Sequence, residues 1–224
     1  MKKYIQTQKN KENYFTVSGI EITIQDPLSE DIDVKSIVKL ALTIVPRILF
    51  KSIRKIKIGQ FKELNDRDLD ALYKDKIIYL TNLQESDADL LDDIIHEIAH
   101  SVEVEYSDMI YSDGSVRREF INKRLKLKKA IDSMGYQISL DLYKQTRYDE
   151  EFDMFLYKKV GYKKIAASTP GLFLSPYAAT SLREYFAIGF ENIFLNQESY
   201  QVMRRNSPSL FEKLINLISI EEEK

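Results

Sequence analysis

The chain has 224 residues, of which 44% are hydrophobic and 30% are charged, so it is long enough to bury the core of a globular domain. Its formal net charge of −2 argues against a nucleic-acid-binding protein, and no stretch approaches the ~20 apolar residues of a membrane span. Cysteine is absent, which excludes disulfides and thiol chemistry.

The start of the sequence is basic but lacks the apolar segment of a secretory signal peptide. We therefore expect a cytoplasmic protein, or one exported by a route other than the Sec pathway, such as phage or toxin delivery. The β-rich runs Tyr14–Val17 and Ile20–Ile24 flank Ser18-Gly19 and predict a hairpin. We interpret residues 1–32 as an N-terminal hairpin extension.

The next segments predict helix and strand in alternation. Apolar residues at helical spacing indicate a helix over residues 33–45, and alternating Ile and Lys indicate a strand with one solvated face near residues 53–58. Residues 65–73 are polar and turn-like. The β-branched run at residues 76–81, KIIYLT, predicts a short strand.

Residues 90–102 read LLDDIIHEIAHSV and hold both histidines of the chain. The apolar positions recur at helical spacing and form a broad stripe, which predicts a helix. Ser86, Asp87 and Asp89 precede this run and supply capping or dipole-compatible groups for its start.

The histidines belong to an HExxH motif. His96 and His100 are four residues apart, so on a helix they share one face and can bind one Zn²⁺. Glu97, between them, can reach a water held on the metal and act as its general base. The motif therefore predicts a zinc-dependent hydrolase.

The second half of the sequence is mainly helical in pattern. Residues 116–134 predict a strongly basic helix, whose charged face we interpret as solvated, with a docking patch for an acidic partner as the alternative. Further helices are predicted at residues 140–144, 150–159, 181–195 and 207–220.

A catalytic zinc needs a third protein ligand, and with no other histidine and no cysteine it must be a carboxylate. Glu184 is the best candidate, because it lies near the start of a helix among apolar and aromatic neighbours. Its capping-box spacing from Ser181 offers a purely structural alternative. Glu191 shares a face with Glu184 and is another candidate; the weaker ones on the histidine helix are Glu103 and Asp93.

Four segments in order, KIIYLTN, IIHEIAHSV, SPYAATSLREYFAIGFENIF and RRNSPSLFEKL, resemble the catalytic domain of anthrax toxin lethal factor and its relatives, which include the clostridial Pro-Pro endopeptidases. The resemblance covers roughly residues 33–217. HExxH is common to many families. The more specific part is Tyr177, seven residues before Glu184, followed by an aromatic helix.

The resemblance implies an α+β, zincin-like metallopeptidase domain over residues 33–224. Such a domain has a small mixed sheet, a central HExxH helix and a mainly helical C-terminal half. It further implies that His96, His100 and Glu184 bind Zn²⁺, that Glu97 is the general base, and that Tyr177 stabilises the oxyanion. The interval between His100 and Glu184 is longer than the family leads us to expect, so we interpret residues 115–160 as a helical insertion.

The leading interpretation is a zinc endopeptidase that binds its protein or peptide substrate as an extended strand along residues 76–81. The first alternative is a catalytically silent binding or cargo module of a toxin, phage or mobile element, built on the same fold. The second is a peptidase-like regulator that cleaves one partner inside the cell.

Overall fold

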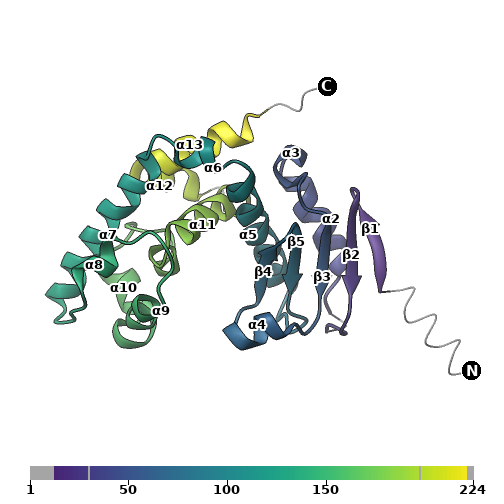
Figure 1. Cartoon of the computed structure of the whole chain (residues 1–224), viewed down its shortest axis with the longest axis horizontal. Helices are drawn as coiled ribbons and strands as arrows, with labels where there is room; N and C mark the ends of the chain where they lie inside the picture. The colour runs from purple at the N-terminus through teal and green to yellow at the C-terminus, as the bar shows by residue number, and fades with distance from the viewer. Residues whose placement is uncertain (1–12, 30, 197, 221–224) are drawn as a thin grey trace, which may run out of the picture. The chain divides into compact units, whose positions relative to one another are not determined.

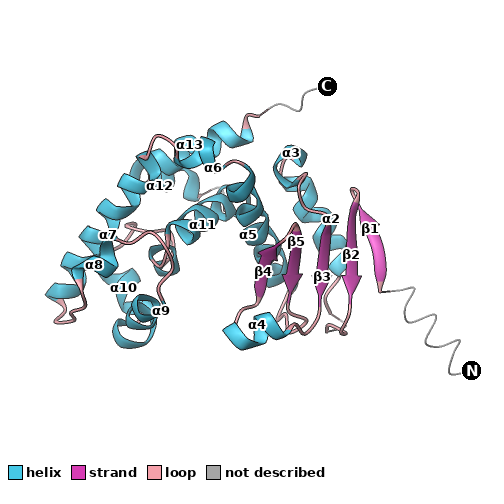
Figure 2. Cartoon of the chain, viewed as in Figure 1, coloured by secondary structure: helices cyan, strands magenta, loops and turns pink. Residues whose placement is uncertain are grey.

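The computed structural model describes residues 13–29, 31–196 and 198–220, and this part of the chain divides into two compact units. Unit 1 comprises the described residues up to Glu105 and contains a sheet with helices. Unit 2 runs from Tyr106 to Ile220 and is helical (Figure 1). The expected α+β class, the small mixed sheet and the mainly helical second half are therefore confirmed (Figure 2).

Unit 1 is built on a five-stranded sheet. Its strands are β1 (Tyr14–Val17), β2 (Ile20–Ile24), β3 (Lys55–Ile58), β4 (Ala71–Lys74) and β5 (Ile77–Leu80). Their spatial order is β1-β2-β3-β5-β4, as Figure 1 shows. The three inner strands are parallel to one another, and the two outer strands run antiparallel to their neighbours.

The predicted hairpin is confirmed, and it joins the sheet of unit 1. Ser18 and Gly19 both have positive φ (51° and 84°), which suits the tight turn between two antiparallel strands. β2 then pairs with β3 in parallel, Ile22 lying opposite Ile56. The hairpin thus extends the sheet by two strands, while residues 1–12 of the predicted N-terminal segment lie outside the described part of the chain.

The predicted strand at residues 76–81 exists as β5, but its predicted role as a substrate-binding edge is wrong. β5 pairs with β3 on one side and with β4 on the other, so both of its edges are occupied. The edge strands are β1 and β4, and most of β4 falls within residues 65–73, which the sequence pattern suggested were a turn. Asp75 and Lys76, with φ of 51° and 66°, form the tight connection between β4 and β5.

The helices of unit 1 are α2 (Val34–Ile44), α3 (Arg47–Phe50), α4 (Lys62–Arg67) and α5 (Asp87–Glu105). α2 packs against α5, and α5 packs against β4 and β5. Val38 and Ala41 of α2, with Ile94 and Ile98 of α5, have no exposed surface. Asp33 N–H donates to the Asp87 carboxylate (3.2 Å) and so links the starts of the two helices.

Unit 2 begins with the short helix α6 (Ser107–Tyr111) and the long helix α7 (Ser115–Ser133). The elements that follow are α8 (Leu140–Lys144), α9 (Glu150–Met154), the π-helix η1 (Phe155–Val160), α10 (Tyr162–Ser168), the 3₁₀-helix η2 (Pro176–Ala179), α11 (Leu182–Leu195), α12 (Ser199–Asn206) and α13 (Pro208–Ile218). In the described part of the chain, no helix combines the length and apolar character that crossing a membrane requires.

The segment interpreted as an insertion, residues 115–160, shares its core with later parts of unit 2. Leu127 of α7, Phe152 of α9 and Leu156 of η1 belong to one buried apolar cluster with Ile165 and Ala179. These helices are therefore packed into unit 2 and are not a separate appendage.

The solvated face predicted for the basic helix is wrong for Lys123 and Arg124, both of which are buried. The Arg124 guanidinium lies 4.0 Å from the centre of the Phe152 ring, and its Nη1 donates to the carbonyl oxygen of Gln145 (2.5 Å). Burial lowers the pKa of Arg124 to about 10, so it stays charged at neutral pH. Aromatic stacking and the hydrogen bond offset part of the cost of burying this charge.

Candidate metal centre

Both histidines lie on α5, whose first turn is fixed by a serine. Ser86 Oγ accepts a hydrogen bond from Asp89 N–H (3.2 Å) and donates one to the Asp89 carboxylate (2.9 Å). Asp87 and Asp89 also place negative charge at the positive end of the helix dipole. The predicted capping is confirmed, and it defines where the histidine-bearing helix begins.

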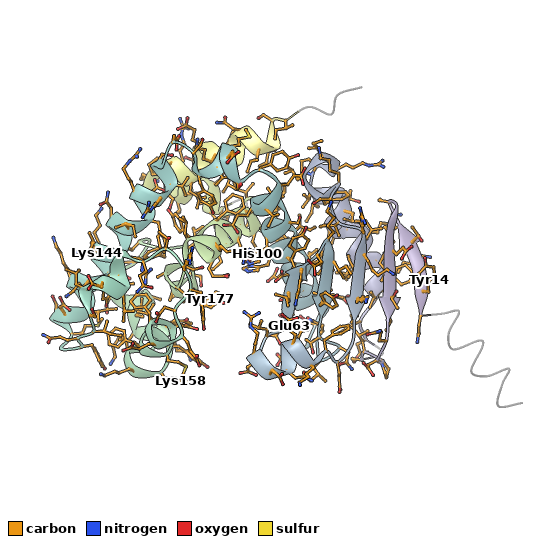
Figure 3. All side chains as sticks on the ribbon, in the orientation of Figure 1. Tyr14, Glu63, His100, Lys144, Lys158 and Tyr177 are labelled. Carbon is orange, nitrogen blue, oxygen red and sulfur yellow. The ribbon has the colours of Figure 1, made fainter. Side chains whose placement is uncertain are left out.

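His96 and His100 stand one helical turn apart in unit 1. Their ring centres are 4.8 Å apart and their planes meet at 86°. His100 is buried and His96 is partly buried; the stick view labels His100 on α5 (Figure 3). Two imidazoles at this separation can each direct one nitrogen toward the same ion.

Glu97 lies between the histidines on the same helix and is 4% exposed. Placing a carboxylate where so little water reaches it is costly unless nearby cations or hydrogen-bond donors compensate. The helix thus presents two imidazoles and one poorly solvated carboxylate, which are the residue types that a metal-activated water and its general base require.

Glu103, considered from the sequence as a possible ligand, lies beside His100. Its Oε2 is 3.6 Å from Nδ1 of His100, and both side chains are 9% exposed. This separation is longer than a hydrogen bond, so the two side chains are neighbours in a poorly solvated place. If His100 binds a metal through Nε2, a small approach of Glu103 would let its carboxylate accept the Nδ1 proton.

We expect Glu103→Gln to weaken zinc binding by about 10- to 100-fold, as is typical when the partner of a metal-binding histidine is changed. The measurement is a competition titration with a zinc chelator of known affinity. Glu105→Gln, which changes an exposed carboxylate on the same helix, is the matched control and should leave the affinity unchanged. Equal affinities for all three proteins would exclude this role.

Asp93, the other weak candidate for the third zinc ligand on α5, is hydrogen-bonded to the segment that follows β5. Its Oδ2 accepts a hydrogen bond from Gln84 Nε2 (2.9 Å), which also approaches the carbonyl oxygen of Thr81 (3.4 Å). Burial raises the pKa of Asp93 to about 6, and the hydrogen bond from Gln84 opposes that rise. Asp93 therefore anchors the helix through Gln84.

The raised pKa of Asp93 makes a prediction for the zinc-free protein. Because the folded state holds this proton more tightly than the unfolded state, its stabilising contribution is full below pH 4 and is lost as the pH rises through 6. Asp93→Asn keeps an acceptor for Gln84 but cannot ionise. As the pH rises from 4 to 7, we expect the free energy of unfolding of the variant to increase by about 2–3 kcal/mol relative to that of the wild type. The measurement is urea unfolding of both proteins in the presence of a metal chelator. A difference in unfolding free energy that does not change with pH would contradict this prediction.

Glu184 lies in the first turn of α11 in unit 2 and is partly buried. Ser181 caps this helix, its Oγ accepting a hydrogen bond from Glu184 N–H (3.1 Å). The predicted serine cap is confirmed, and it uses the backbone of Glu184, so the cap does not require the carboxylate. Glu191, two turns further along α11, is also partly buried.

Tyr177 lies in η2, which packs against α11 in the same unit. Ser175 begins this turn by accepting a hydrogen bond from Tyr177 N–H (3.2 Å), and the Tyr177 carbonyl oxygen accepts from Thr180 N–H and Oγ1 (2.9 and 2.8 Å). The backbone around Tyr177 is thus held by three hydrogen bonds. Figure 3 labels its side chain.

The predicted site residues therefore come from two local structures: His96, Glu97 and His100 from α5, and Tyr177 and Glu184 from the segment formed by η2 and α11. Sequence reasoning missed the pairing of Glu103 with His100, although a spacing of three on a helix could have indicated it. Comparisons with protein-family models, with curated proteins and with solved structures find no match for this chain.

Proposed function

We propose that this chain is a zinc-dependent endopeptidase in which His96, His100 and Glu184 bind one Zn²⁺. The observation that carries the proposal is the pair of imidazoles on α5, with ring centres 4.8 Å apart and Glu97 between them. Glu184 is the third ligand in this proposal, as the resemblance implies, because the chain has no other histidine and no cysteine.

The chemistry of these donors suits zinc. Two neutral imidazoles and one carboxylate are a common ligand set of catalytic zinc, and they leave one position open for water or substrate. Glu103, 3.6 Å from Nδ1 of His100, lies near enough to accept the Nδ1 proton after a small movement, and Nε2 would then be the metal-binding nitrogen. Bound zinc would supply a Lewis acid for the scissile carbonyl and a water that ionises near neutral pH.

The side chains then have distinct roles in peptide-bond hydrolysis. Glu97 accepts a proton from the attacking water as the new C–O bond forms, and it returns this proton to the amine as the C–N bond breaks. Tyr177 donates a hydrogen bond to the oxyanion, which is worth roughly 3 kcal/mol for comparable donors. Its role also rests on the resemblance of residues 33–217 to the catalytic domain of lethal factor.

The substrate-binding strand is reassigned from β5 to β4. In the described residues β4 pairs with a strand on one side only, and it contacts α5, the helix that carries both histidines. An extended peptide that added to this edge would gain main-chain hydrogen bonds without displacing a strand. Side chains of β4 would then contact side chains of the peptide and contribute to the enzyme's preference for particular substrate sequences.

The proposal is tested by incubating the full chain with a peptide library derived from a proteome and identifying new peptide termini by mass spectrometry. We expect cleavage that stops in 1,10-phenanthroline and returns when zinc is restored. Cleavage that survives complete zinc removal would contradict the proposal. Zinc binding without cleavage of proteins or peptides would instead favour the catalytically silent module.

A further inference from the structure

Unit 2 contains a cavity of about 440 Å³ lined mainly by polar and basic side chains. One wall is α7, and the other is formed where α12 ends and α13 begins (Figure 1). The side chains that bear on the argument are Arg118, Asn122, Lys123, Lys126, Arg205 and Ser209.

The basic wall follows from helical spacing. Arg118, Asn122 and Lys126 are successive residues four apart on α7, so they form one row along the helix. Arg205, in the last turn of α12, and Ser209, in the first turn of α13, contribute the facing wall. Cations from separate helices therefore face a common space.

The two walls are held together by Glu119. Its carboxylate accepts hydrogen bonds from the backbone N–H groups of Ser209 (2.8 Å) and Leu210 (3.1 Å) and from the hydroxyl of Tyr185 (2.8 Å). These bonds fix the start of α13 against α7. They also occupy the one carboxylate among the lining residues, and its charge compensates the positive end of α13.

The remaining cations are available to a ligand. Within the described ranges, no carboxylate forms an ion pair with Arg118, Lys126 or Arg205, and all three side chains are exposed. The nearby Asp113 carboxylate pairs with Lys213 (2.8 Å), whereas Arg118 Nη1 donates to the Asp113 carbonyl oxygen (3.1 Å). That bond positions the guanidinium and leaves its other N–H groups for an anion.

Lys123, which is buried, adds a fourth cation to the lining of the cavity. Its ammonium donates to the carbonyl oxygen of Leu172 and lies over the rings of Phe173 and Tyr185. Burial lowers the pKa of Lys123 to about 8, so a bound anion would stabilise its charged form. Residues 106–220 hold 17 Lys and Arg against 13 Asp and Glu, although the whole chain is slightly acidic.

We propose that this cavity binds a compact anion of the phosphate-monoester or pyrophosphate class, with Arg118, Lys126 and Arg205 as its main ligands. Guanidinium groups match phosphate oxygens through paired hydrogen bonds, and ammonium groups add charge. The cations face one another across a single cavity instead of following an extended stripe, which favours a compact anion over a nucleic-acid backbone. This inference does not depend on the proposed zinc chemistry.

The test is calorimetric titration of the full chain with pyrophosphate at fixed ionic strength. We expect saturable binding that is weakened roughly tenfold or more by Arg118→Gln and by Lys126→Gln, since each removes a charge-assisted contact. Lys129→Gln on the same helix and Lys144→Gln on α8 (Figure 3) change exposed cations outside the cavity and should bind like the wild type.

Absence of saturable binding would overturn the proposal, and so would equal weakening by the cavity and control variants, because that result indicates diffuse attraction. Because pyrophosphate could also bind a zinc ion, the four variants distinguish the sites: a zinc-bound anion would be insensitive to Arg118→Gln. The phosphate group could belong to a phosphorylated protein or to a free phosphate compound. Competition between pyrophosphate and a phosphoserine peptide, with the same peptide unphosphorylated as the control, distinguishes these two sources. Displacement by the phosphopeptide alone assigns the cavity to phosphorylated proteins, and no displacement assigns it to free phosphate compounds.

Discussion

Glu97→Gln should retain bound zinc and lose peptidase turnover by about 10²- to 10⁴-fold, the range typical for removal of a general base. Gln has nearly the same volume as Glu, so it fits the buried position, where the native side chain is 4% exposed. It cannot accept the proton of the attacking water. Zinc binding should persist because Glu97 is not a ligand in the proposed site. Turnover is measured on a peptide identified in the library screen, and zinc content by elemental analysis.

Glu105→Gln is the matched control for Glu97→Gln. It makes the same change of carboxylate to amide at an exposed position on the same helix and should leave turnover unchanged. If Glu97→Gln cleaved the peptide at the wild-type rate with zinc bound, the assignment of the base would be wrong. If zinc were lost together with turnover, Glu97 would act on metal binding and the proposed division of roles would fail.

Glu184→Ala should weaken zinc binding by more than about 100-fold, because removing a ligand costs more than changing a residue behind one. The helix itself should survive. Ser181 Oγ caps α11 through the backbone N–H of residue 184, which the variant keeps, and Ala is a strong helix former. Affinity is measured by chelator competition, and helix content by circular dichroism.

Glu191→Ala provides the comparison for Glu184→Ala, because it removes the second carboxylate from the same helix. We expect its zinc affinity to match that of the wild type. The reverse outcome, loss in Glu191→Ala and full affinity in Glu184→Ala, would transfer the third-ligand role to Glu191. Full affinity in both variants would exclude α11 as the source of a ligand.

Local patterns in the sequence predicted the elements that carry the candidate site. The apolar stripe of α5 and the Ser86 cap are features of short range, as is the Ser181 cap of α11, so they could be predicted correctly. The alternation of buried Ile and solvated Lys in β3 is equally local.

The wrong predictions concern the spatial order of the strands and the exposure of side chains on the basic helix. Strand order depends on contacts between distant segments, so the inner position of β5 and the edge position of β4 had no local signal. In the same way, the sequence indicated a basic helix, but only packing shows that Arg124 lies against Phe152 while Lys126 and Lys129 on the same helix remain exposed. Periodicity could not distinguish a solvated arginine from one stacked on an aromatic ring.

Zinc stoichiometry tests the central claim most directly. Elemental analysis of the wild-type chain, purified without a metal-binding tag and reconstituted with zinc, should give about one zinc per chain, and the double variant His96→Ala/His100→Ala should give none. No zinc in the reconstituted wild type, or equal zinc in the double variant, would contradict a metal centre on α5 and the enzymatic function proposed from it.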